Sequence, residues 1–276
     1  MKFTDILAIV SSGSDSEPVI AAAEQLALQN TGQVSGLVIG WMPPVSLSVE
    51  GWAVSPVWGD AAEDSRKQLS AELERVKNRI QRTDLAGGVQ SELLELGVGR
   101  TVTGMRGRHA DITVVEQPRT DFGDAIVEGA LFESGRPVLI VPPTWKPRQI
   151  GKSALVCWKP TREAARALGD ADDLLLGARQ VTVVTVDARP SHDGYGPRPG
   201  VDITAHLARR GVKVQLANLD SMGRTDASVI DEHALAVDAD LIVMGGYGRS
   251  RMSQFIFGGM TREMLKTARV PVLMSH

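Results

Sequence analysis

The chain repeats one series of segments twice, and this duplication limits the fold more than any other feature of the sequence. An apolar run, a turn and a helix-forming stretch open each half, at residues 6–28 and 154–168. Four further apolar runs follow in the same order in both halves, so five elements correspond. Because strands alternate with helices, each half is expected to form a mainly parallel sheet with right-handed crossovers. The matched runs are ILAIV and ALVCW, VSGLVIG and VTVVTVD, VQSELLEL and VKVQLANL, DITVVEQ and DLIVMGG, and RPVLIVP and VPVLMS.

A proline-rich stretch at residues 142–152 separates the two repeats. Such a composition is typical of a linker. We therefore expect one domain at residues 1–145 and a second at residues 150–276. A chain of 276 residues is long enough for two small α/β domains.

Composition excludes several classes of function. A net charge of −3 provides no general attraction to nucleic acids or acidic membranes. The single cysteine, Cys157, excludes an intrachain disulfide framework and fits a reducing compartment. No apolar run approaches the length of a membrane span, and the first residues lack the features of a signal peptide. We expect a cytoplasmic protein that binds neither nucleic acid nor membrane.

Glycines follow the fourth predicted strand of the second repeat, at Leu241–Met244. They belong to a loop that leads into a segment with helical spacing of its apolar residues. Glycine allows another group to approach the backbone closely, and a helix N-terminus presents free N–H groups. Together these features form a physical basis for an anion site. The glycines are Gly245, Gly246, Gly248, Gly258 and Gly259.

The spacing Gly245-x2-Gly248-x9-Gly258, followed by Gly259-Met260-Thr261, resembles the nucleotide-loop signature of the universal stress protein family. With the duplication, the whole chain resembles a tandem universal stress protein. The resemblance implies two tandem adenine-nucleotide α-hydrolase-like domains. Each would be a five-stranded, mainly parallel sheet of order 3-2-1-4-5 with helices on both faces. It also implies a stress-response protein with one site for an adenine nucleotide, ATP with Mg²⁺, in the second domain.

Two positions depart from the pattern of the nucleotide-binding family members. Those members carry Ser or Thr where this chain has Gly259, so one hydroxyl contact to a phosphate is lost. They also carry an aspartate near the ribose where this chain has Lys159, whose counterpart in the first repeat is Ser11. A lysine cannot accept a hydrogen bond from a ribose hydroxyl, although it can reach a phosphate.

The binding crevice is expected outside the carboxyl ends of the strands, where the strand order reverses. By resemblance, Val186 matches the residue that contacts the adenine. Trp158 either stacks on a base or closes the crevice, and Arg249 either contacts a phosphate or faces solvent. The predicted nucleotide-binding residues are Cys157, Trp158, Lys159, Val186, Met244, Gly245, Gly248, Arg249, Gly258, Gly259, Met260 and Thr261.

The first repeat lacks the glycine loop. Aligning Pro137 with Pro271 places Asp124 opposite Gly258 and Ala125 opposite Gly259. A carboxylate at Asp124 would repel a phosphate. We therefore expect the first domain to keep the architecture and to bind no nucleotide.

Two other functions stay open at this point: a scaffold that acts through protein partners without nucleotide, and a slow ATPase. No catalytic acid/base pair and no metal-ligand spacing is evident in the sequence, so we predict neither catalytic residues nor a metal site.

The loop at residues 41–58, rich in tryptophan and proline, is expected either to pack as a lid or to form a ligand or partner surface. The last strand would be an exposed sheet edge unless it is paired. We therefore expect the halves to pack as a pseudo-dimer, and two chains to associate as a homodimer.

Overall fold

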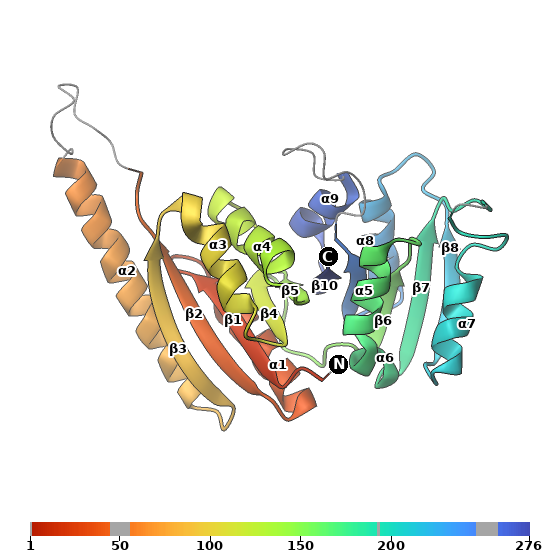
Figure 1. Cartoon of the computed structure of the whole chain (residues 1–276), viewed down its shortest axis with the longest axis horizontal. Coiled ribbons are helices and arrows are strands. Elements are labelled where there is room, and N and C mark those ends of the chain that lie inside the picture. Colours follow the sequence, from red (N-terminus) through yellow and green to blue (C-terminus); the bar gives the residue numbers. More distant parts are fainter. Residues whose placement is uncertain (1, 45–55, 192–193, 247–258) are drawn as a thin grey trace.

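The computed structural model describes residues 2–44, 56–191, 194–246 and 259–276. In these residues strands and helices alternate in both halves (Figure 1). The strands of the first half are β1 (Asp5–Ser11), β2 (Gln33–Trp41), β3 (Ala86–Leu94), β4 (Ile112–Glu116) and β5 (Val138–Val141). The strands of the second half are β6 (Ser153–Cys157), β7 (Gln180–Val186), β8 (Val214–Leu219), β9 (Leu241–Gly245) and β10 (Val272–Ser275). The helices are α1 (Glu17–Asn30), α2 (Pro56–Gln81), α3 (Leu96–Gly107), α4 (Asp121–Glu133), α5 (Arg162–Asp170), α6 (Asp172–Leu176), α7 (Val201–Arg209), α8 (Asp226–Ala236) and α9 (Gly259–Thr267).

One continuous 10-stranded sheet runs through the described part of the chain, in the order β3-β2-β1-β4-β5-β10-β9-β6-β7-β8. Read from either edge toward the centre, each half has the predicted order 3-2-1-4-5. Neighbouring strands within each half are parallel. The fold class predicted from the sequence is therefore confirmed.

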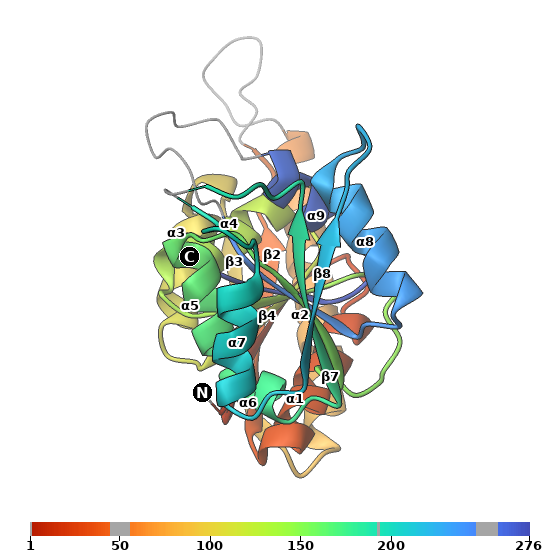
Figure 2. The same ribbon diagram turned by 90° about the vertical axis from the view of Figure 1, so that its right-hand side faces the viewer.

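Helices cover both faces of the sheet. Apolar side chains of α1, α2, α5, α6 and α7 pack on one face, and those of α3, α4, α8 and α9 pack on the other. Figure 2 shows α7 and α8 on opposite sides of β7 and β8. Strands buried on both faces must be apolar along their whole length, which explains the continuous apolar runs in the sequence. Of the helices in the described residues, none has the length and apolarity that crossing a membrane requires.

The two halves meet at the middle of the sheet, where β10 pairs antiparallel with β5. Leu273 lies opposite Leu139 in this pair, and both side chains are fully buried. The last strand, which would otherwise be an open edge, is thus covered by the edge of the other half. The expected packing of the halves within one chain is observed, while association of two chains stays a prediction.

The sequence pattern predicts a helix over residues 60–82, ended by Gly87 and Gly88, and two boundaries differ from that prediction. Helix α2 begins at Pro56 instead of residue 60, because proline suits the first turn of a helix. Gly87 and Gly88, expected to end that helix, instead lie in β3. A Cβ atom on Gly87 would lie 2.7 Å from the carbonyl oxygen of Val34, so glycine allows β3 to approach β2 closely. Residues 45–55 of the predicted loop lie outside the described residues, and the role of that loop stays a prediction.

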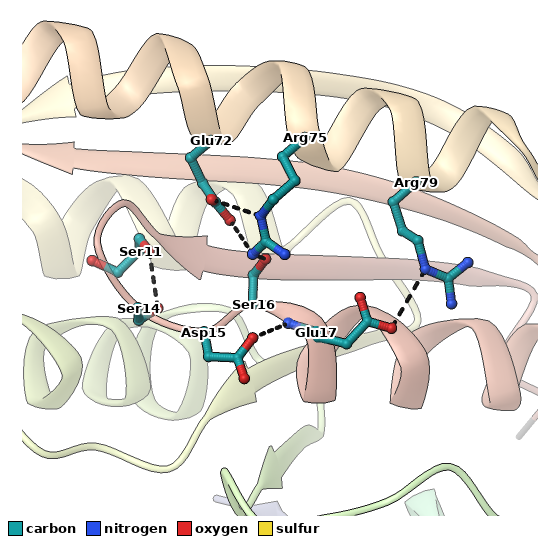
Figure 3. A network of polar contacts seen from close by, with 8 residues as sticks. All are labelled: Ser11, Ser14, Asp15, Ser16, Glu17, Glu72, Arg75 and Arg79. Carbon is teal, nitrogen blue, oxygen red and sulfur yellow. Dashed lines mark hydrogen bonds and ion pairs between the residues drawn. The ribbon is translucent and has the colours of Figure 1, made fainter.

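Arginines of α2 hold the start of α1 through polar contacts (Figure 3). Arg75 bonds to the Ser16 hydroxyl and to Glu72 of its own helix. Arg79 bridges Glu17 at 3.5 Å and Glu24 at 2.7 Å. The second oxygen of Glu24, Oε1, is buried and has no hydrogen-bond partner in the described residues. Burial raises the pKa of Glu24, and the Arg79 guanidinium opposes this shift.

Replacing Arg79 by alanine is expected to lower the free energy of unfolding by about 1 kcal/mol at neutral pH, because the buried Glu24 loses its counter-charge while Arg79 itself is partly exposed. An acid whose folded-state pKa is raised loses stability as pH rises from its unfolded pKa to its folded pKa. The deficit of Arg79→Ala should therefore shrink as pH falls to about 4, where Glu24 becomes mostly protonated in both states. Urea unfolding at the two pH values measures this.

Adding Glu24→Gln should restore the stability, whereas Arg66→Ala on the exposed face of α2 should change little. A deficit that does not depend on pH would contradict the assignment to Glu24.

Candidate functional site

A cavity of about 330 Å³ opens at the carboxyl ends of β6, β7 and β9. The strand order of the second half reverses at this point, where open α/β sheets bind ligands. Three of the predicted site residues, Gly248, Arg249 and Gly258, lie outside the described residues. All the others line this one cavity. They are Cys157, Trp158, Lys159, Val186, Met244, Gly245, Gly259, Met260 and Thr261.

The inner part of the cavity is apolar. Buried Cys157, Val184 and Met244 project from the carboxyl ends of three adjacent strands, and Ile230 of α8 faces them. Burial raises the pKa of the Cys157 thiol to about 12, so it is uncharged at neutral pH and contributes packing instead of nucleophilic chemistry. Trp158 is partly buried, lines the cavity and does not fill it. The result is an open apolar slot.

Gly245 permits the close approach of α5 to β9. A Cβ atom at this position would lie 2.4 Å from the backbone nitrogen of Ala164 and 2.5 Å from the carbonyl carbon of Glu163. Real Cβ atoms do not approach backbone atoms so closely. The first glycine of the motif therefore brings the N-terminus of α5 to the edge of the cavity.

Three helix N-termini surround the cavity. Thr161 caps α5 by accepting a hydrogen bond from the Ala164 N–H at 3.2 Å. Thr225 caps α8 and also donates to Glu263 of α9 at 2.6 Å, which ties the first turn of α8 to α9. Helix α9 begins at Gly259, on the cavity wall. Helix N-termini carry partial positive charge, so their arrangement favours an anionic group.

Lys159, Asp226 and Tyr195 are the titratable groups at the mouth of the cavity besides Cys157, among the residues described. Burial raises the pKa of Asp226, and Asp187 adds to the rise while Lys159 opposes it. Burial also raises the pKa of Tyr195, and Asp226 adds to this shift. Within the described part of the chain, the cavity mouth thus offers one cation and one carboxylate to a ligand. In the described residues no group of three or more His, Cys, Asp and Glu side chains could hold a metal ion.

Sequence reasoning missed several lining residues. Asp226 follows a Thr cap at the start of a helical segment, and this capping pattern was available in the sequence. Tyr195 lies in a polar connection after β7 that carries no periodic signal, so its place at the cavity depends on tertiary structure alone. The remaining missed residues are Thr161, Ala164, Val184 and Ile230.

Strand registers relate this cavity to the first half. The N–H of Asp111 donates to the carbonyl of Asp5, as the N–H of Asp240 donates to that of Ser153. Ile6 pairs with Ile112 in the first half, as Ala154 pairs with Leu241 in the second. Counting along each strand from these pairs places Ser11 at the position of Lys159, as predicted, and Glu116 at the position of Gly245.

The connection after the fourth strand also differs between the halves. Residues 117–120 separate the strand from the next helix in the first half, whereas residues 246–258 stand between β9 and the first described residue of α9, and 247–258 lie outside the described residues. Val138 pairs with Thr113 as Val272 pairs with Ile242, which supports the alignment of Pro137 with Pro271. Asp124 lies in the first turn of α4, together with Asp121. The absence of nucleotide from the first half stays a prediction.

Comparison with known proteins agrees with this architecture. Residues 152–276 match the model of the universal stress protein family. A universal stress protein from Archaeoglobus fulgidus superposes with a TM-score of 0.69 at 13% identity, covering 98% of this chain and 95% of that one. A proposed universal stress protein from Pseudomonas aeruginosa superposes with a TM-score of 0.59 at 15% identity, covering 99% of this chain and 93% of that one.

At these identities the structural likenesses show the fold alone, and they extend it over both halves. No curated protein matches the chain. The family match covers the half that carries the glycine motif and the apolar cavity. Residues 152–276 thus match the universal stress protein family, and the first half of the chain repeats the same fold in tandem.

Proposed function

We propose that the second half binds an adenine nucleotide, ATP with Mg²⁺, and that the chain is a cytoplasmic stress-response protein with this single nucleotide site. One observation carries the proposal: all the predicted site residues that the structure describes line a single cavity. The cavity combines an apolar slot, three helix N-termini and a lysine. An aromatic base needs an apolar surface such as this slot, and a phosphate needs a positive one such as the helix N-termini and the lysine.

Each part of the cavity has a role in this proposal. The base would lie in the slot formed by Cys157, Val184 and Met244, beside Trp158. The phosphates would face the N-terminus of α9, where Thr261 adds a hydroxyl. Lys159 would donate to a phosphate oxygen instead of accepting from the ribose. These residues fit a nucleotide with fewer hydrogen bonds than the family pattern provides, so we expect weak binding.

Two alternatives remain outside this proposal. A scaffold without nucleotide would leave the cavity without a ligand and act through partner proteins. A slow ATPase would need a group that activates water near the terminal phosphate. Asp226 is the carboxylate at the cavity mouth, and its raised pKa follows from burial and neighbouring acids. That shift alone does not make it a catalytic base, so binding is the function we propose.

Restoring the hydroxyl of the family pattern is expected to tighten ATP binding. Gly259→Ser adds a phosphate contact in open space, because a Cβ at Gly259 has no neighbour within 4 Å among the described residues. It should lower the Kd for ATP about tenfold, the worth of one hydrogen bond to a charged group. Lys159→Asp gains an acceptor for the ribose and loses the contact of the lysine to a phosphate, so it should not tighten binding in the same way. Isothermal titration calorimetry on the full chain with Mg²⁺ measures this.

The first half provides a matched control, because Ser11 is the counterpart of Lys159. Ser11→Asp should leave ATP binding unchanged. If Ser11→Asp changes the Kd for ATP as much as Gly259→Ser does, the assignment of the site to the second half is wrong. If neither the natural chain nor Gly259→Ser binds ATP, the scaffold function is favoured.

A further inference from the structure

The first half contains a second cavity at the equivalent place, of about 560 Å³. It lies at the carboxyl ends of β1, β2 and β4, between the β1–α1 turn, the β4–α4 connection and α2. The nucleotide proposal does not use this cavity.

An aromatic pair closes the region that corresponds to the apolar slot. The buried Trp41 ring stacks on Phe122 of α4, with ring centroids 4.5 Å apart. Its Nε1 donates to the Ser11 hydroxyl at 2.8 Å. A Cβ on Gly99 of α3 would lie 2.5 Å from the Trp41 ring, so this glycine accommodates the indole. Trp41 thus fills the space between α3 and α4, and a base has no slot here.

The charge of the two cavities also differs. Ser11 replaces Lys159, and Glu116 replaces Gly245, so the first half loses a cation and gains a half-buried carboxylate. Burial raises the pKa of Glu116, Asp15 adds to the rise, and the Ser14 hydroxyl and Arg119 oppose it. Asp15, Glu116 and Arg119 are the titratable lining groups among the described residues, with two acids against one base. A phosphate therefore meets net repulsion.

Hydroxyl and amide groups make up the rest of the polar lining. The Ser14 hydroxyl donates to the carbonyl of Ser11 at 2.9 Å, and Arg75 of α2 holds Ser16, two residues further along (Figure 3). The turn is therefore fixed before a ligand arrives. Such a lining both donates and accepts hydrogen bonds. The hydroxyl and amide residues of the cavity are Ser11, Ser12, Ser14, Ser65, Gln68, Gln117 and Thr120.

We propose that the first-half cavity binds a small polyhydroxy compound of monosaccharide size that carries no phosphate and is neutral or bears an amine. Adjacent hydroxyls of such a ligand donate to the carboxylates and exchange hydrogen bonds with the serines. An amine on the ligand would also form charge-assisted hydrogen bonds with the carboxylates of Glu116 and Asp15. The chain would then bind two different ligands in two equivalent crevices of its duplicated fold.

Three probes that differ in one group test the proposal on the full chain: glucose, glucosamine and glucose 6-phosphate. Saturation-transfer NMR detects binding, and titration provides each Kd. Glucose and glucosamine are expected to bind, and glucose 6-phosphate about tenfold more weakly than glucose because of the two acids. Saturating ATP should displace none of them.

Variants at Glu116 test whether the sugars bind in this cavity. Glu116→Gln keeps the size of the side chain and removes its charge. It should weaken the binding of glucosamine about tenfold and change the binding of glucose less. Glu116→Gly reproduces the residue of the second half and should remove the discrimination against glucose 6-phosphate. Asp64→Asn is the matched control, because Asp64 neighbours Ser65 in the chain and does not line the cavity. Circular dichroism confirms that each variant is folded.

Several results would overturn the proposal. The charge argument is wrong if glucose 6-phosphate binds as tightly as glucose. The ligand class is wrong if no probe binds saturably at millimolar concentration. The location is wrong if Glu116→Gln behaves like Asp64→Asn toward glucosamine.

Discussion

Replacing Leu139 by alanine is expected to lower the free energy of unfolding by about 3 kcal/mol. Leu139 lies in β5 directly opposite Leu273 of β10, and both side chains are fully buried in the same apolar cluster. A truncation here removes apolar burial and leaves a cavity between two strands that other strands flank on both sides. Leu273→Ala should have a similar cost.

The double variant Leu139→Ala/Leu273→Ala tests whether the two side chains act together. Side chains in direct contact couple, so its loss should differ from the sum of the single losses by about 1 kcal/mol. Urea unfolding followed by circular dichroism measures all three variants. Leu176→Ala is the control, since Leu176 is 43% exposed and should cost little. If each single loss is below about 1 kcal/mol, the junction between the halves contributes little to the core.

This junction shows what a sequence pattern can predict. Apolar runs predicted the strands, and the open edge of PVLMS predicted that something must cover it. The pattern also placed the lining residues together, because the ends of parallel strands meet at one edge of a sheet. Repetition strengthened both predictions, since each element had to suit its counterpart.

Other features depended on contacts between distant segments. Gly87 and Gly88 resemble a helix stop, yet Gly87 lies in β3 because β2 approaches it there. Tyr195 reaches the cavity of the second half from a connection without periodicity. In the first half, Asp124 lies in the first turn of α4 and does not line the cavity, whose acids among the described residues are Asp15 and Glu116. A sequence does not reveal the volume left around Glu116. Pro56 is a miss of another kind, because proline at the start of a helix is a local signal.

Replacing Gly245 by alanine is expected to lower the free energy of unfolding by about 2 kcal/mol, because the added methyl group meets the backbone of α5 and not a side chain that could rotate away. A backbone contact at 2.4 Å can be relieved only if α5 moves from β9. That movement would shift the N-terminus of α5 and its cap, Thr161, at the edge of the cavity. The variant should therefore also bind ATP more weakly, about tenfold.

Gly169→Ala provides the matched control, since it adds the same methyl group within α5 itself. Among the described residues, no atom outside the adjoining backbone of the helix lies within 4 Å of the new Cβ. Alanine is the better helix former, so this change should raise stability by about 0.5–1 kcal/mol. Thermal and urea unfolding of both variants, with ATP titrations, separate a general effect of the substitution from the specific contact. If Gly245→Ala is as stable as Gly169→Ala, then α5 does not press on β9 as described, and the first glycine of the motif has no packing role. If it is destabilised yet binds ATP normally, the glycine serves the fold alone, and the N-terminus of α5 contributes nothing to the ligand.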